Sequence, residues 1–204
     1  TLGAATSADP LYAGMDAEDV SAVNKDDDAA GITVTPTAGL TTSESGGTAS
    51  FTVVLRSQPV AEVTVPVSSG NPAEGRIDVS TLTFTSADWN VPQTVTVTGV
   101  DDAVQDGNVQ YTVVLGNAVS TDPAYSGLDA DDVSLVNSDN DAASINVSAA
   151  AGLATSESGA SATFSVVLGS EPTGDVTIPV TSSNPAEGIL NVASLTFTAA
   201  DWNV

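Results

Sequence analysis

The sequence has no cysteine, no histidine and very little positive charge. Its 204 residues include three lysines and arginines against 26 aspartates and glutamates, which gives a formal net charge of −23 at pH 7. Without cysteine or histidine there is no disulfide framework, no thiolate or imidazole zinc site and no Cys- or His-based catalysis. Nucleic acid and anionic membrane surfaces repel so acidic a chain, and we therefore expect neither as a partner.

Long apolar runs are also missing. No stretch approaches the roughly 18 apolar residues that a membrane-spanning helix needs, so we expect no membrane insertion. The segment that begins at Thr1 does not have the pattern of a signal peptide. Hydrophobic residues nevertheless make up 41% of the chain, and the mean hydropathy is +0.14. That content is sufficient for a packed core and differs from that of a disordered acidic tail.

A long internal repeat is the strongest feature of the sequence. When the chain is shifted by 113 residues, 56 of the 91 overlapping positions are identical, and the Asp-Trp-Asn motif around Trp89 recurs around Trp202. We therefore expect the C-terminal part of a preceding repeat at residues 1–28, a complete repeat at 29–141 and the N-terminal part of a following repeat at 142–204. A unit of this length can fold around its own core, so the sequence predicts a window on a tandem array of domains.

Alternating apolar side chains indicate β-strands throughout the complete repeat, and no segment has the periodicity of an amphipathic helix. Clusters of Gly, Pro, Asn, Asp and Ser separate about seven expected strands, which lie at residues 32–34, 51–55, 63–67, 82–84, 94–98, 109–115 and 133–136. This number of strands in one such unit predicts an antiparallel β-sandwich of immunoglobulin-like type, repeated in tandem.

The acidic residues lie mainly between the expected strands. If each strand reverses the direction of the one before, the loops after the first, third, fifth and seventh strands lie at the same pole of the sandwich. These four loops carry seven carboxylates, namely Glu44, Glu74, Asp101, Asp102, Asp106, Asp139 and Asp141. Crowded carboxylates repel one another, and Ca²⁺, which takes six to eight oxygen ligands in adaptable geometry, removes that conflict. We expect a calcium site at this pole; the alternative is that the acids only solvate the surface.

The opposite pole and the junction between repeats carry further candidates. Trp89 is either a sugar-stacking platform or a plug for the end of its own core. Asp129, Asp131 and Asp132 form either a second ion site or a solvated turn.

At the junction, the next expected strand begins within a few residues of Asp141, with no Gly/Ser linker. Bound calcium is therefore expected to stabilise the domain and to stiffen the junction, so that an array of domains becomes a rigid rod.

The order of these motifs resembles the Calx-β domain, a module of sodium–calcium exchangers that also occurs in tandem in large bacterial surface proteins. The resemblance covers the whole complete repeat. It rests on Glu44 in the first loop, the Asp101–Asp102 pair, a Tyr-x-Val-x-Leu strand that begins at Tyr111 and an acidic triplet that ends at Asp141. It implies a calcium-binding, immunoglobulin-like fold.

The resemblance also implies which residues bind calcium. The ligands would be the same seven carboxylates together with the backbone carbonyl of Val104. Alanine and glutamine stand at positions 103 and 105, where the family commonly has acids. This departure implies fewer ions or weaker binding than in the exchanger domains. Near-identical tandem units are more similar to the extender regions of bacterial adhesins than to a solitary sensor.

We weigh three functions against this sequence. The first is a calcium-stabilised structural or extender repeat of a large bacterial cell-surface or extracellular protein, such as an adhesin stalk or a filament, whose partners are adjacent repeats or neighbouring copies. The alternative is a carbohydrate-binding β-sandwich module that contacts glycan through Trp89. A carboxylate-only hydrolase is the third; we do not expect an enzyme, because the acids lie at loop ends and copies of an active site along an array have little purpose.

The two partial repeats raise a question of assembly. Residues 1–28 and 142–204 together make most of one more domain, lacking about 22 residues that include two strands. Strand donation between neighbouring chains is therefore an alternative to a longer array cut at both ends.

Overall fold

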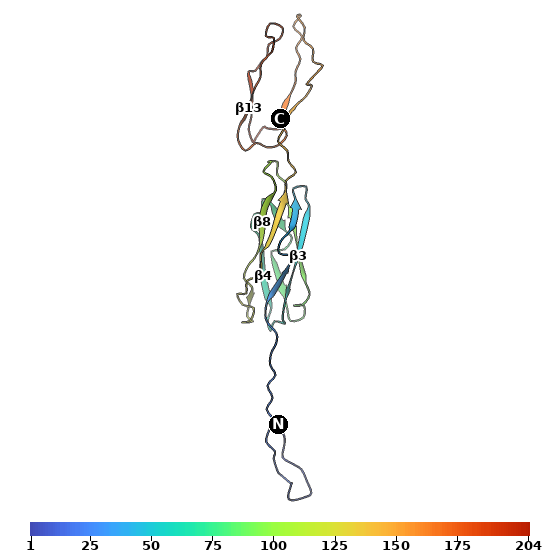
Figure 1. Ribbon diagram of the computed structural model, residues 1–204, viewed down its shortest axis with the longest axis vertical. Helices are drawn as coiled ribbons and strands as arrows, with labels where there is room; N and C mark the ends of the chain where they lie inside the picture. The colour runs from blue at the N-terminus through green and yellow to red at the C-terminus, as the bar shows by residue number, and fades with distance from the viewer.

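The computed structural model describes residues 1–204, and its regular structure is entirely β (Figure 1). Ten strands between Ile32 and Ser138 form a sandwich at the middle of an elongated molecule. Four more strands form two separate hairpins toward the C-terminus. At the other end, residues 1–28 contain no strand, and their first part folds back into a loop in which Ala5 and Met15 are joined by a backbone hydrogen bond. No helix capable of crossing a lipid bilayer is present.

The sandwich consists of two sheets whose strand order is that of immunoglobulin-like domains. The four strands of the first sheet are, in spatial order, β1 (Ile32–Thr35), β3 (Thr48–Leu55), β7 (Gln93–Gly99) and β5 (Gly75–Ile77). The second sheet contains β2 (Leu40–Ser43), β10 (Val133–Ser138), β8 (Val109–Leu115), β4 (Val63–Ser69) and β6 (Thr81–Phe84), with β9 (Val119–Ser120) added against β4. Every pairing is antiparallel except β2 with β10, which is parallel.

Alternation along the strands produces the core between the two sheets. In β7, Val95 and Val97 are fully buried while Thr94 and Thr98 are exposed, because successive side chains of a strand point to opposite faces. The core contains 20 buried residues, and Tyr125, Phe51 and Phe84 have the largest fully buried side chains among them. Burial of one such side chain contributes about 1.5–3 kcal/mol, so this cluster holds the two sheets together.

The predicted immunoglobulin-like β-sandwich is confirmed, but three short strands were not predicted. Four residues of β2, three of β5 and two of β9 are too few to produce a recognisable alternation of apolar side chains. The first two predicted strands, β1 and β3, run antiparallel as expected, but the unpredicted strand β2 lies between them in the sequence. β1 and β2 run in the same direction, one at the edge of each sheet, so Glu44 follows the second strand instead of the first.

In the flanking segments, residues 1–28 and 142–204, side chains that align with core residues of the sandwich are exposed. Phe51 is 1% exposed, whereas Phe164, which occupies the same place in the following repeat, is 42% exposed. Tyr125 is buried, and its counterpart Tyr12 is exposed.

The C-terminal hairpins are β11 (Ile145–Val147) with β12 (Val166–Leu168) and β13 (Val176–Pro179) with β14 (Ser194–Phe197). The division of the chain at residues 28 and 141 stays a prediction.

Candidate metal centre

Four loops meet at the pole of the sandwich that faces the C-terminal hairpins. They follow β2, β4, β7 and β10, and hydrogen bonds from two asparagines connect them. Asn140 donates its backbone N–H to Glu44 Oε2 (2.9 Å) and its side-chain amide to Asp101 Oδ1 (3.0 Å). The side-chain amide of Asn137 lies 3.3 Å from Glu74 Oε2. Residues far apart in the sequence are thereby held within one small volume.

Within this volume the carboxylates form two clusters. The first contains Glu44, Asp139 and Asp141, and the second contains Glu74, Asp102 and Asp106. In each cluster, one oxygen from every residue lies within 4.8 Å of the others. Ligand oxygens bound to one Ca²⁺ at about 2.4 Å lie no more than about 4.8 Å apart, so each cluster has the dimensions of a cation site.

Burial and mutual repulsion disfavour ionisation in the first cluster. Burial raises the pKa of Glu44, and the charges of Asp139, Asp102 and Asp141 raise it further, although the Asn140 N–H opposes this shift. Burial also raises the pKa of Asp141, followed by repulsion from Asp139 and the acids of the loop after β7. Oδ2 of Asp141 is buried and has no hydrogen-bond partner.

Backbone amides fix the orientation of the loop carboxylates. Asp139 Oδ1 accepts a hydrogen bond from the Asp141 N–H, and its Oδ2 accepts one from Gly107, both at 2.7 Å. Gly107 has φ +80°, a backbone conformation that suits glycine. Asp102 Oδ1 accepts from the Val104 N–H at 2.8 Å. The short loops therefore present their carboxylates in defined positions.

Asn137 connects the second cluster to the core, and the sequence interpretation missed it. Its side chain is buried, donates to the Val100 carbonyl as well as to Glu74, and accepts a hydrogen bond from Thr42 Oγ1. Thr42 in turn bonds the Tyr111 hydroxyl, whose pKa burial raises. The signal was available, because Asn137 occupies the inward position that continues the buried series of Val133 and Leu135.

Two of the eight predicted ligands are not among the clustered carboxylates, and one of them, Val104, is predicted to bind through its backbone carbonyl, which these side-chain clusters do not include. Asp101 is exposed and accepts the Asn140 amide, so it borders the first cluster. The Val104 carbonyl accepts the backbone N–H of Asp106 at 2.9 Å, and the Val104 side chain faces the following repeat. The other six, Glu44, Glu74, Asp102, Asp106, Asp139 and Asp141, lie in the two clusters. Ligand roles for all eight residues stay a prediction.

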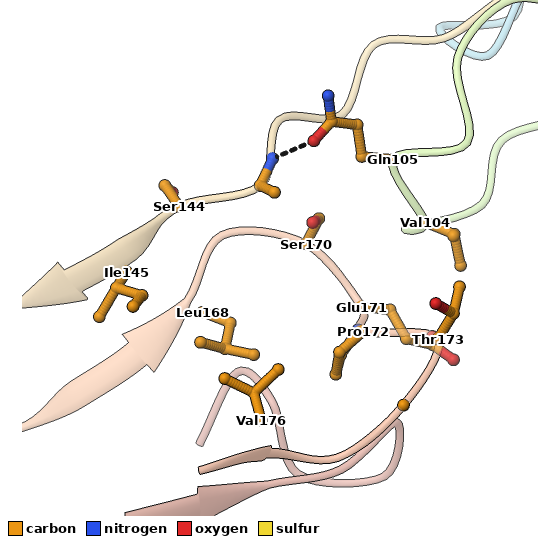
Figure 2. A pocket seen from close by; sticks show the side chains of 12 residues that line it. Val104, Gln105, Ser144, Ile145, Leu168, Ser170, Glu171, Pro172, Thr173 and Val176 are labelled. Carbon is orange, nitrogen blue, oxygen red and sulfur yellow. Dashed lines mark hydrogen bonds between the residues drawn. The ribbon is translucent and has the colours of Figure 1, made fainter. Parts of the chain in front are cut away.

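The loop after β7 also contacts the following repeat. Gln105 Oε1 accepts the Ala143 N–H at 2.8 Å, and the Ala103 carbonyl accepts the Glu171 N–H at 2.6 Å. Figure 2 shows the side chain of Val104 across a cavity from Leu168 and neighbouring residues. The cavity has a volume of about 620 Å³. The acidic pole is therefore continuous with the junction between consecutive repeats.

At the opposite pole, the side chains serve their own domain. Trp89 is half-buried and packs against the core, and its carbonyl accepts the Leu55 N–H. Asp132 accepts the Leu115 N–H, while Asp129 and Asp131 are exposed, and none of the three belongs to a cluster of possible ligands. Trp89 therefore packs as a plug of its own core would, and the choice between a second ion site and a solvated turn for the three aspartates stays a prediction.

The strand order and the acidic pole define an immunoglobulin-like β-sandwich with clusters that could hold cations. No protein-family model matches the sequence, and no curated protein matches it. Similar solved structures include the periplasmic chaperone SfaE, at 10% identity and a TM-score of 0.42, with 54% of this chain and 58% of the chaperone covered. The chain thus spans little more than half of that protein.

Two other similar structures are single domains. The apo form of the Calx CBD1 domain shares 18% identity at a TM-score of 0.40, over 54% of this chain and 96% of that domain. The ASH/PapD-like domain of human CEP192 shares 15% identity at a TM-score of 0.39, and the match covers 62% of this chain and 96% of that domain. These scores are low, so the assignment of the fold rests on the strand order of this chain itself.

Proposed function

We propose that the chain is a calcium-stabilised structural segment that extends a large bacterial cell-surface or extracellular protein. The observation that carries the proposal is Oδ2 of Asp141, a buried carboxylate oxygen without a partner inside a cluster of three acids. A buried polar atom without a partner costs about 1–3 kcal/mol, and more when it is charged. A bound cation removes both this cost and the repulsion between the acids.

The donor set favours calcium over other metals. All six clustered side chains offer carboxylate oxygen, which hard cations prefer, and the chain has no cysteine or histidine for zinc or copper. Magnesium demands near-ideal octahedral geometry and retains its water ligands, whereas calcium accepts irregular oxygen sets. Glu44, Asp139 and Asp141 would hold one ion, and Glu74, Asp102 and Asp106 another.

Repetition of the same acids supports a structural role. Asp28 aligns with Asp141, and Glu157 and Glu187 align with Glu44 and Glu74. Copies of one cation site along an array stabilise every unit equally, whereas a site for a specific target needs only one copy. The proposed partners are accordingly the adjacent repeats or neighbouring copies of the chain, and the proposal includes no enzymatic activity.

The junction supports the extension of the proposal to a rigid rod. The loop that carries Asp102 and Asp106 also makes the hydrogen bonds to Ala143 and Glu171. An ion held by this loop would restrict its motion and, through the same loop, the motion of the following repeat. The packing of Trp89 against the core gives no support to the carbohydrate-binding alternative.

Calorimetric titration with calcium tests the proposal with a matched pair of variants. Glu44→Gln should weaken calcium binding by at least tenfold, because it removes one charged ligand from the first cluster. Glu157→Gln changes the aligned residue, which is exposed and belongs to no cluster, and should bind as the unchanged chain does. Equal affinity in both variants, or no calcium binding by the unchanged chain, would contradict the proposal.

A further inference from the structure

Asn140 is the uncharged residue between the two aspartates that follow β10, and it contacts acids from two other loops. Its backbone N–H donates to Glu44 Oε2 of the first cluster, and its side-chain amide donates to Asp101 Oδ1 at 3.0 Å. Asp101 is exposed and belongs to neither cluster. A hydrogen bond to a carboxylate stabilises its charged form, so the amide gives Asp101 a partner without a bound ion.

The repeat offers a second version of this segment. Residues 138–141 read Ser-Asp-Asn-Asp, and the aligned residues 25–28 read Lys-Asp-Asp-Asp. A lysine thus stands in place of Ser138 and an aspartate in place of Asn140. The first segment has two aspartates, and the second has three aspartates and one lysine, so both carry a formal charge of −2. The added negative charge is therefore matched by a positive charge two residues away.

The side chain of Ser138 points toward the loop that carries Asp101. Ser138 is the last residue of β10, and its hydroxyl donates to Asn108 Oδ1 at 3.3 Å, at the end of the loop after β7. The same oxygen of Asn108 accepts the Asp139 N–H at 3.1 Å. A lysine at position 138 has a longer side chain, which in this direction brings its ammonium group to the acidic loop.

We propose that the residue at position 140 sets how much positive charge the acidic pole needs from bound cations. With asparagine, the amide satisfies Asp101, and the pole takes up only the cations of the two clusters. With aspartate, Asp101 loses its donor and the pole gains a charge, so it needs either a further divalent cation or a lysine at position 138. This inference rests on the proposed function, because it takes the two clusters to be the cation sites.

The consequence is a calcium demand that differs from one repeat to another. Neighbouring carboxylates disfavour one another's charged forms, and calcium relieves them only where its concentration suffices for binding. An amide or an ammonium group of the chain itself is present at every calcium concentration. The residues at positions 138 and 140 therefore determine how strongly a repeat depends on calcium.

Urea unfolding of the metal-free chain at low ionic strength tests this charge balance, because salt screens exposed charges. Asn140→Asp should lower the urea midpoint by about 0.5 M, since Asp101 loses its donor and meets a new carboxylate. Addition of Ser138→Lys to this variant should restore the midpoint of the unchanged chain.

Two control variants separate this effect from a general effect of charge. Ser134→Lys, combined with Asn140→Asp, adds the same charge to the same face of β10 but farther from the pole, and it should not restore the midpoint. Asp27→Asn changes the exposed residue that aligns with Asn140 and should leave the midpoint unchanged.

Calorimetric titration of the same variants tests the calcium demand. Asn140→Asp should bind one more calcium ion per chain than the unchanged chain, and the double variant with Ser138→Lys should bind the same number as the unchanged chain. An unchanged midpoint in Asn140→Asp, an unchanged number of ions in that variant, or equal restoration by lysine at positions 134 and 138 would each overturn the proposal. If no variant binds calcium, the proposed function fails, and the metal-free midpoints still decide whether Asn140 balances the charge of the pole.

Discussion

Replacement of Asn137 by alanine tests how the core supports the acidic pole. The change removes three side-chain hydrogen bonds, to Thr42, Glu74 and the Val100 carbonyl. A typical hydrogen bond contributes about 1 kcal/mol net, and an unpaired buried partner raises that cost, so we expect a loss of about 3 kcal/mol. For a domain of about 100 residues this loss lowers the melting temperature by more than about 10 °C.

Urea unfolding of the metal-free chain, followed by circular dichroism, measures this effect. Asn24 aligns with Asn137 but is exposed, so Asn24→Ala serves as a control that should leave the transition unchanged. Asn137→Ala should also reduce the stabilisation by calcium, because Glu74 loses the amide that orients it. A loss below about 1 kcal/mol, within the range of a single exposed substitution, would refute the view that Asn137 connects the core to the cluster.

Two more predictions concern acidity and packing. Without metal, the free energy of unfolding should rise as the pH falls from 7 toward 4.5, the ordinary pKa of a glutamate such as Glu44. The reason is that the pKa values of Glu44 and Asp141 are raised in the folded state, so the folded state binds protons more readily than the unfolded state does. The lowered pKa of Asp88 has the opposite effect on stability, but only near its ordinary value of 3.8. Urea midpoints at pH 7 and pH 5 measure this trend, and a decrease on acidification would contradict it. In the same assay, Phe51→Ala should lower the free energy of unfolding by about 3–5 kcal/mol, whereas Phe164→Ala, at the exposed counterpart, should leave it unchanged. Equal losses of stability in the two variants would contradict this prediction, because they would show that both repeats are packed alike.

The position of the acids at one pole was predictable from the alternating direction of the predicted strands and from the order of the loops between them. Glu44, Glu74 and the acids after β7 and β10 follow strands that end at the same side of the sandwich. The unpredicted strand β2 did not disturb this result. β1 and β2 continue in one direction, so Glu44 reaches the same end whether one strand or two precede it.

Other features depend on three-dimensional proximity and were not predictable. The sequence contains no signal that separates the acids into two clusters or that leaves Oδ2 of Asp141 without a partner. The carbonyl of Val104 stays a predicted ligand that the resemblance implies. The Val104 side chain lines the junction cavity, a position set by the arrangement of two consecutive repeats. Asn137 could have been noticed, since a polar residue in a buried series usually has hydrogen-bond partners.

Thermal unfolding of the full chain in calcium and in chelator tests the central claim most directly. If the dissociation constant is about 10 μM, 1 mM calcium stabilises the folded state by about 2.7 kcal/mol, which raises the melting temperature by roughly 10 °C for a domain of this size. We predict a shift of that order, reversed by chelator and reduced in Asp141→Asn but not in Asp28→Asn, the aligned exposed residue. An unchanged melting temperature would contradict the account, since the clustered acids would then only solvate the pole.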